Sequence, residues 1–209
     1  MIVHRYLAGL IGWTAFAPML NLEIMMLLNI RENKAARKWT RYELFLRVLW
    51  ALARPLFRYS PRIFWSWRIW ILRLFGASVG SDVHIHPTAS IMLPWNLRID
   101  SEASVGDRAI LYNLGLISIG AAATISQGAH LCAGTHDYLR ADLPLLKSPI
   151  SIGKGAWICA DGFVGPGVKI GDYAIVGARA VAMRDVDDWA IVVGNPAKVI
   201  GTRPRPISE

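Results

Sequence analysis

One hydrophobic position in six recurs along most of this chain. From Val79 onward the sequence can be written in hexads that each begin with Ile, Leu or Val, and a small residue usually stands four positions later. The register slips by two residues before Ile99 and again before Ile119, and a long gap separates His136 from Ile152. The fourteen hexads begin at Val79, Ile85, Ile91, Ile99, Val105, Leu111, Ile119, Ile125, Leu131, Ile152, Ile158, Val164, Ile170 and Val176.

This period predicts a column of flat-sided coils. Positions six apart fall on different faces of an α-helix, and the strict alternation of a two-sided strand is absent. In a coil with flat sides the aliphatic residues point inward and stack, while small residues and Gly or Asp-Gly pairs fit the corners. Coils spaced ~4.8 Å apart, about five in number, form a column roughly 25 Å tall. Its open strand edges need caps, and the N-terminal region and C-terminal tail are the candidates.

Residues 6–30 form an apolar segment whose only charge is Glu23. The segment is long enough to span a membrane as a helix, although Pro18 and Asn21 interrupt it. A re-entrant or interfacial helix and a signal peptide whose apolar run ends at residues 15–17 are alternatives that the sequence leaves open.

Residues 40–75 predict two helices broken at Pro55 and Pro61. The second helix has two apolar sides and therefore needs two covers. The column supplies one cover, and a neighbouring subunit or the acyl boundary of a membrane supplies the other. The alternative is a plain helical cap whose arginines reach water. The apolar positions are Ile63, Phe64, Trp67, Trp70, Ile71 and Leu74 on one side and Trp65, Ile69 and Leu72 on the other.

Positive charge is concentrated in the first third of the chain. Residues 1–73 contain twelve Lys or Arg and three Glu, and the remainder is nearly neutral, although the whole chain carries +8. This cationic, tryptophan-rich region favours a membrane surface or a cap. Nucleic acid is not expected as a partner, because no recognition-helix, RNA-binding or zinc-finger pattern accompanies the charge. Two cysteines, Cys132 and Cys159, allow no disulfide framework, which favours a cytoplasmic location. The cationic, aromatic region would then place the protein at the surface of the inner membrane.

Several stretches within the hexads resemble a known family. Residues 45–203 are similar to the hexapeptide-repeat acyltransferases, and among these to the acetyltransferases of colanic acid and related exopolysaccharide biosynthesis. The stretches that carry this resemblance are Arg73-Leu-Phe-Gly-Ala, Pro94-Trp-Asn-Leu, Leu111-Tyr-Asn-Leu, Ile125-Ser-Gln-Gly-Ala-His-Leu-Cys, Gly134-Thr-His-Asp, Pro166-Gly-Val and Gly194-Asn-Pro-Ala-Lys.

The resemblance implies a mainly β fold, a left-handed parallel β-helix of about five coils with an N-terminal helical region and a protruding catalytic loop. The left hand comes from the resemblance alone, because crossover statistics favour the other hand. We therefore expect an N-terminal region at residues 1–75, a β-helix domain at 76–203 with an extruded loop at 137–150, and a tail at 204–209.

The long gap in the repeat is the natural place for chemistry, because long loops on rigid scaffolds often carry function. His136 stands at its start, with Asp137 next and Asp142 within reach. The resemblance implies that His136 is a general base that takes the proton from an acceptor hydroxyl. That role needs a neutral imidazole held in one tautomer by a carboxylate or carbonyl, and Asp137 is the first candidate carboxylate. The alternative is that His136 only ends a coil and hydrogen-bonds the loop.

Binding residues are predicted on both sides of this loop. Acceptor-side candidates are Asn113, Tyr112, His130 and Asp142; a structural role is the alternative for His130, which lies one hexad from His136 and so on another face. The resemblance implies a groove for acetyl-CoA along the later coils. It nominates Trp157, Ala160, Gly177 and Ala178, with Arg179, Arg184, Lys198 and Arg203 as phosphate partners. The family often has Ser and Thr-Lys where this chain has Arg179 and Met183-Arg184, so hydroxyl contacts to CoA are in doubt there while the positive charge is kept.

These features predict an O-acetyltransferase that moves acetyl from acetyl-CoA to a sugar hydroxyl in exopolysaccharide biosynthesis. The resemblance implies a homotrimer with the site between subunits, and a lipid-linked saccharide acceptor fits the cationic, aromatic N-terminal region. The alternatives are a zinc-dependent β-helix hydrolyase of the γ-carbonic-anhydrase kind and a non-catalytic scaffold. The histidines, at 4, 84, 86, 130 and 136, lack the tight His-x4-His pair of that hydrolyase family, so no metal is expected.

Overall fold

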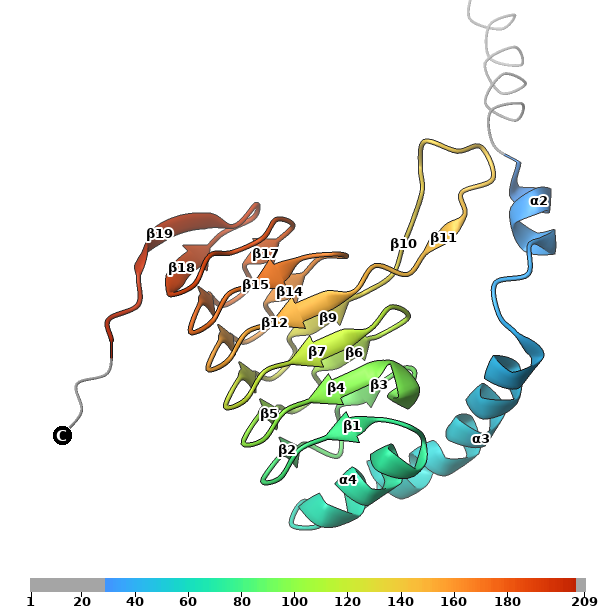
Figure 1. The fold of residues 1–209 in the computed structure, drawn as a ribbon, viewed down its shortest axis with the longest axis horizontal. Coiled ribbons are helices and arrows are strands. Elements are labelled where there is room, and N and C mark those ends of the chain that lie inside the picture. The colour runs from blue at the N-terminus through green and yellow to red at the C-terminus, as the bar shows by residue number, and fades with distance from the viewer. Residues whose placement is uncertain (1–28, 206–209) are drawn as a thin grey trace, which may run out of the picture. The chain divides into compact units, whose positions relative to one another are not determined.

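The computed structural model describes residues 29–205, whose fold is drawn in Figure 1. The described chain divides into two compact units: one contains residues 39–135 and 146–205, and the other contains residues 29–38 and 136–145. The apolar segment predicted at residues 6–30 lies outside the described residues apart from Asn29 and Ile30. None of the helices within residues 29–205 is long and apolar enough to cross a membrane.

Three parallel sheets form the walls of the larger unit (Figure 1). Each turn of the chain adds one strand to each wall, so neighbouring strands within a wall are one coil apart. The first wall contains β1 (Ser78–Val79), β4 (Leu97–Ile99), β7 (Ile117–Ile119), β12 (Ile150–Ile152) and β15 (Lys169–Ile170). The second contains β2 (His84–Ile85), β5 (Ser104–Val105), β8 (Thr124–Ile125), β13 (Trp157–Ile158), β16 (Ile175–Val176) and β18 (Ala190–Val193), and the third contains β3 (Ser90–Ile91), β6 (Ile110–Tyr112), β9 (His130–Cys132), β14 (Phe163–Val164) and β17 (Val181–Ala182).

The strand register confirms the predicted stacking of the hexads. In the first wall the first residues of successive hexads are direct partners, from Val79 through Ile99, Ile119 and Ile152 to Ile170. All of these side chains are buried. The column therefore contains a continuous ladder of aliphatic side chains, and burial of such apolar surface is the main force that stabilises it.

The column is longer than predicted. After β17 the chain makes a sixth turn, in which Val186 bridges Ile170 and β18 pairs with β16. The hexad pattern stops before this turn because Ala182 replaces an aliphatic residue at the end of the fifth coil, and the next inward residue, Val186, follows after four positions and not six. The final strand, β19 (Lys198–Thr202), turns back and pairs antiparallel with β18, which covers one open edge.

The two register slips fall at one corner of the column, between the third wall and the first. There the chain spends two extra residues in the first coil and two in the second. Asn113 is fully buried at this corner: its side-chain oxygen accepts from the N–H groups of Met92 and Leu93, and its amide donates to the carbonyls of Leu93 and Asn96. In the third coil the chain leaves the column at the same corner, after Thr135.

Two helices close the open end of the first coil. They are α3 (Arg41–Arg58) and α4 (Trp65–Leu74). Coil 1 donates its N–H groups to coil 2, so its own outward carbonyls have no strand partner. Side chains from the helices supply the missing donors: Trp50 Nε1 bonds the carbonyl of Ile91 at 3.0 Å, Arg68 Nε that of Ile85 at 2.7 Å, and Arg73 Nη2 that of Val79 at 2.6 Å. One side chain therefore caps each of the three walls.

The helices differ from the prediction in two respects. α3 continues through Pro55 and ends only at Arg58, so the predicted break at Pro55 is wrong. Proline removes one hydrogen bond to the carbonyl four residues earlier, here that of Ala51, which lies on the exposed side of the helix where water can replace the lost donor. α4 has a buried and an exposed apolar side, but the sides differ from the prediction: Ile71 is buried with Leu72, whereas Trp67 and Trp70, predicted to lie on the side of Ile71, are exposed.

The capping bond of Trp50 gives a direct test of this fold. Replacing Trp50 by Phe keeps an aromatic ring but leaves the buried carbonyl of Ile91 without a donor. We expect Trp50→Phe to lower the free energy of unfolding by about 1–3 kcal/mol, measured by chemical denaturation. The matched control is Trp70→Phe, because Trp70 is 55% exposed and stacks on Trp67. Equal effects of the two substitutions would contradict the capping role.

Candidate active site

The excursion from the column is a short hairpin. β10 (Thr135–His136) pairs with β11 (Leu145–Leu146), and the N–H of Asp137 donates to the carbonyl of Pro144 at 3.0 Å. His136 is therefore held at the base of the hairpin by regular backbone hydrogen bonds, and its side chain is exposed. Such a position fixes the backbone of His136 while its ring remains open to a substrate.

The imidazole of His136 is oriented by a backbone carbonyl. Nδ1 lies 2.6 Å from the carbonyl oxygen of Leu143. A carbonyl only accepts, so Nδ1 carries the proton of the neutral ring and Nε2 is left with a free lone pair. Leu143 has a φ of 42°, in the left-handed region that is uncommon for residues other than glycine. The hairpin thus adopts an unusual turn at the residue that orients the ring.

Neither predicted carboxylate bonds to the imidazole. Asp137 accepts from the N–H of Leu139 at 3.0 Å, which closes a local turn. Asp142 forms an ion pair with Arg140 at 3.0 Å, and the hydrogen bond from Arg140 lowers the pKa of Asp142. The two side chains shape the hairpin, and the carbonyl of Leu143 is the group that orients His136.

Asn33 is a site residue that sequence reasoning missed. It lies in α2 (Ile30–Ala35), in the same unit as the hairpin, and its amide donates to the carbonyls of Asp142 and Leu143 at 2.6 and 2.5 Å. Lys38 Nζ donates to the side-chain oxygen of Asn33 at 2.6 Å. Asn33 therefore fixes the carbonyl that orients His136. No sequence signal pointed to it, because Asn33 precedes the stretch that carries the family resemblance.

The predicted acceptor-side residues have different environments. Asn113 is fully buried with its amide hydrogen-bonded, so its side chain braces the corner and is not free to contact a sugar. His130 packs edge-on against Phe163 at 5.2 Å, its Nε2 is buried without a partner among the described residues, and burial lowers its pKa. Tyr112 is half-buried and lies against Gly134, where an added Cβ would approach its ring to 3.2 Å.

The structure brings several predicted CoA residues together on adjacent coils. Ala160 and Arg179 lie one above the other, with the N–H of Arg179 donating to the carbonyl of Ala160 at 2.9 Å. The N–H groups of Ala160 and Ala178 make no hydrogen bond within residues 29–205, so both remain available to a ligand. Trp157 is exposed and donates to Ser126 at 2.8 Å. Gly177 is buried, and a Cβ there would meet Val193 at 2.7 Å, so its role is to admit the next coil.

The four predicted phosphate partners are not equivalent. Arg184 and Lys198 are exposed and make no ion pair with any described residue. Arg179 has an exposed ion pair with Asp161 at 3.5 Å. Arg203 donates to the carbonyl of Gly155 at 2.9 Å and is half-buried, so its guanidinium fastens the C-terminal segment to the column. Arg184 and Lys198 are the freest cations of this set.

A polar cleft of about 660 Å³ lies on the second wall, and the sequence analysis did not find it. Trp65 packs against His84 at one side, with ring centroids 4.7 Å apart and the ring planes tilted by 38°. His86 Nδ1 lies 2.6 Å from the hydroxyl of Thr88, which in turn donates to Asp107. Further side chains that line the cleft are Arg62, Ser104, Thr124, Ser126 and Gln127. The sequence signal for this cleft lies in the residues just before the inward aliphatic positions of the second wall. His84, Ser104 and Thr124 hold these positions and point outward from that wall.

Two other kinds of chemistry find no support in residues 29–205. No group of three His, Cys, Asp or Glu side chains is placed to hold a metal ion there. Burial raises the pKa of the Cys159 thiol, which disfavours the thiolate that a nucleophilic cysteine needs.

No protein-family model matches the chain. Among curated proteins, the chain is 42% identical over 158 residues to the colanic acid biosynthesis acetyltransferase WcaF of Escherichia coli (strain K12), which covers 76% of this chain and 87% of that protein. It is 30% identical over 125 residues to the galactoside O-acetyltransferase of the same strain, over 59% of this chain and 55% of that protein.

Solved structures share the fold. A maltose O-acetyltransferase from Clostridium difficile 630 matches with a TM-score of 0.72 at 23% identity, over 79% of this chain and 90% of that one. A galactoside acetyltransferase in complex with coenzyme A matches with a TM-score of 0.72 at 22% identity, over 78% and 83% of the two chains. The expected left-handed parallel β-helix is thereby confirmed. With the identity to WcaF across most of both proteins, the chain belongs to the hexapeptide-repeat acetyltransferases and, among these, to the family of the colanic acid biosynthesis acetyltransferase.

Proposed function

We propose that this acetyltransferase moves the acetyl group of acetyl-CoA to a hydroxyl of a saccharide during exopolysaccharide assembly, with His136 as the general base. The observation that carries the proposal is the hydrogen bond between His136 Nδ1 and the carbonyl of Leu143. With the Nδ1 proton held by this carbonyl, Nε2 is the nitrogen of the exposed ring that can accept a proton, which is what a general base for a hydroxyl needs. The name of the relative WcaF supports the choice of a colanic-acid-like pathway.

The proton moves through His136 Nε2 in both halves of the reaction. Nε2 takes the proton of the acceptor hydroxyl while the oxygen attacks the carbonyl carbon of the thioester. The carbon–sulfur bond then breaks, and the leaving thiolate of CoA receives the proton from the imidazolium. The products are an acetyl ester and the free thiol. The Leu143 carbonyl keeps the Nδ1 proton in place throughout, so the ring gains and loses its second proton only at Nε2.

Backbone and cationic groups on the later coils are proposed to hold CoA. The free N–H groups of Ala160 and Ala178 suit the amide carbonyls of the pantetheine arm, and the exposed ring of Trp157 suits its apolar stem. Arg184 and Lys198 are proposed to bind the phosphates, because they are exposed cations without an ion pair among the described residues.

We also propose where the saccharide binds and how the subunits assemble. The polar cleft on the second wall of a neighbouring subunit is the proposed saccharide site, because hydroxyl and carboxylate groups converge there beside the flat ring of Trp65. We propose a homotrimer in which one subunit supplies His136 and a neighbour supplies part of the CoA groove. The enzyme is proposed to act in the cytoplasm on a lipid-linked saccharide, peripheral to the inner membrane.

The tautomer of His136 can be measured directly. In ¹⁵N-labelled protein, long-range proton–nitrogen correlation spectra distinguish a protonated from an unprotonated ring nitrogen. We expect the neutral His136 ring to carry its proton on Nδ1, because the Leu143 carbonyl accepts from it. The spectrum of His136→Asn identifies the His136 signals. A proton on Nε2 of the neutral ring would contradict the proposed geometry.

Removing the base should abolish most of the activity. We expect His136→Ala to lower kcat by about 10²–10⁴-fold, measured as thiol release from acetyl-CoA with a saccharide acceptor. Tyr138→Ala is the matched control, because Tyr138 is 82% exposed in the same hairpin; it should keep kcat within a few-fold. Full activity of His136→Ala would sink the assignment.

The phosphate partners can be separated from other effects with a truncated donor. We expect Arg184→Gln and Lys198→Gln each to raise the KM for acetyl-CoA about fivefold, the loss that corresponds to one solvent-exposed ion pair of about 1 kcal/mol. With acetyl-dephospho-CoA, which lacks the 3′-phosphate, the substitution that removes the 3′-phosphate ligand should have no further effect. Unchanged KM values for both variants with acetyl-CoA would place the phosphates elsewhere.

A further inference from the structure

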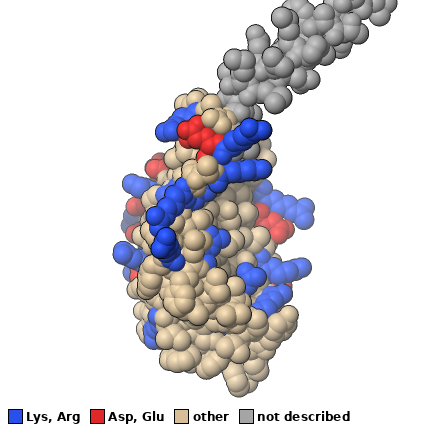
Figure 2. All heavy atoms as spheres, turned by 90° about the vertical axis from the view of Figure 1, so that its right-hand side faces the viewer, with Lys and Arg blue, Asp and Glu red and all other residues tan. Residues whose placement is uncertain are grey.

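The side of α3 and α4 that faces away from the column is a broad apolar surface. Its members are large hydrophobic side chains that the β-helix does not cover, such as Leu52, which is 72% exposed. In Figure 2 the lower part of the molecule, where Figure 1 places α4 and the end of α3, shows a broad area without Lys, Arg, Asp or Glu. We call this surface the α3–α4 apolar face; it contains Phe45, Val48, Leu52, Leu56, Trp67 and Trp70.

The charge beside this face has one sign. Residues 44–81 contain six arginines and no Asp or Glu. Arg68 and Arg73 are occupied in capping the first coil, as described above. Arg54 and Arg58, one helical turn apart on α3, make no hydrogen bond or ion pair with any described residue. Two neighbouring guanidinium groups without a carboxylate partner create an unbalanced positive potential at one border of the apolar face.

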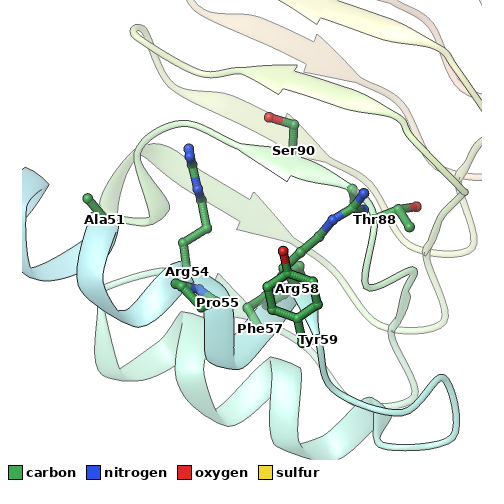
Figure 3. Close-up of a pocket in the computed structure, with 9 residues that line it drawn as sticks. Ala51, Arg54, Pro55, Phe57, Arg58, Tyr59, Thr88 and Ser90 are labelled. Atoms are coloured by element: carbon green, nitrogen blue, oxygen red, sulfur yellow. The ribbon is translucent and has the colours of Figure 1, made fainter.

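Arg54 and Arg58 line a pocket of about 470 Å³ between α3 and the first coil. Figure 3 shows both guanidinium groups projecting from α3 on the side where Thr88 and Ser90 lie, with the ring of Tyr59 beside Arg58. Because the Thr88 hydroxyl already donates to Asp107, the available donors are the two guanidinium groups and the hydroxyl of Ser90. Guanidinium groups bind phosphate through paired, charge-assisted hydrogen bonds. The pocket therefore suits one phosphate group.

An apolar groove adjoins this pocket. It has a volume of about 710 Å³ and is lined by Leu56, Phe64 and Trp67. Pro55 and Tyr59 line both this groove and the Arg54–Arg58 pocket. A ligand with a phosphate in one pocket would thus have its next atoms over aromatic and aliphatic side chains. Few classes of molecule combine a phosphate with hydrocarbon at this separation, and phospholipids are the commonest.

We propose that the α3–α4 apolar face docks on an anionic phospholipid bilayer, with the Arg54–Arg58 pocket taking a lipid phosphate and the adjoining groove contacting acyl chains. Exposed Trp and Leu side chains bordered by arginines are the composition that partitions into the interface of a bilayer. This inference gives residues and lipid chemistry to the surface contact proposed above, and it does not depend on which hydroxyl the enzyme acetylates.

The charge beside the α3–α4 apolar face indicates which partner binds it. Anionic lipid headgroups complement the exposed Arg54 and Arg58 in a stretch, residues 44–81, that contains no acidic residue, and each cation near such a membrane strengthens binding about fivefold. A second copy of this chain would bring the same unpaired arginines against one another, since an isologous contact repeats the same patch on both sides. The membrane is therefore the better partner for this surface.

The test is binding of the full chain to lipid vesicles, measured by flotation. We expect binding to vesicles of equimolar phosphatidylcholine and phosphatidylglycerol, and much weaker binding to phosphatidylcholine alone. Arg54→Gln with Arg58→Gln should weaken binding to the anionic vesicles about 25-fold, and Leu52→Gln with Leu56→Gln roughly tenfold or more. All variants retain residues 1–30, so any contribution of that segment is constant.

Matched double variants elsewhere on the column serve as controls. Arg98→Gln with Lys169→Gln removes the same charge, and Val199→Gln with Ile200→Gln removes exposed aliphatic side chains; both should bind like the parent. Thiol release with a water-soluble saccharide acceptor should be unchanged in the Arg54, Arg58, Leu52 and Leu56 variants, which separates this inference from the proposed catalysis. Equal binding of all variants, no preference for phosphatidylglycerol, or a change of oligomeric state in Leu52→Gln with Leu56→Gln would overturn the proposal.

Discussion

Each coil of the β-helix is held to the next by main-chain hydrogen bonds along three walls and by inward aliphatic side chains that stack on their equivalents one coil away. This arrangement makes the column rigid because every corner is tight and every inward position is filled. It also leaves two needs. The chain must close the open edge of the first coil, and extra residues can be accommodated only at a corner. The helices α3 and α4 close that edge, and the hairpin that carries His136 leaves the column at a corner.

The two sides of the helix pair α3 and α4 have different roles. Trp50, Arg68 and Arg73 each donate to an outward carbonyl of the first coil, one for each wall. A helix pair that faces the column in this way must present its other side elsewhere, and here that side is apolar with arginines at its border. Burial of Arg68 is tolerated because its guanidinium also reaches the carbonyls of Pro61 and Arg62.

The column could be predicted from the sequence because the period of six identifies the residues that point inward. The stacking of Ile119 on Ile152 across the long gap follows from the hexads alone, and His136 follows from where the repeat stops. Tertiary hydrogen bonds could not be predicted in this way. That Asn113 is buried, that Leu143 orients His136 and that Asn33 fixes Leu143 all depend on where carbonyl groups come to lie, and periodicity carries no information about that. The break expected at Pro55 failed for a similar reason, since packing of the helix outweighed its local preference.

In the proposed reaction the oriented imidazole of His136 takes the proton of a sugar hydroxyl while acetyl passes from acetyl-CoA to the sugar oxygen. The most direct measurement incubates the purified protein with acetyl-CoA and a panel of nucleotide sugars and lipid-linked saccharides, and follows thiol release together with the mass of each acceptor. The account predicts that thiol is released only with an acceptor, and that this acceptor gains one acetyl group which mild alkali removes, as expected for an ester. Thiol release without acceptor, or an alkali-stable acetyl group on nitrogen, would contradict it.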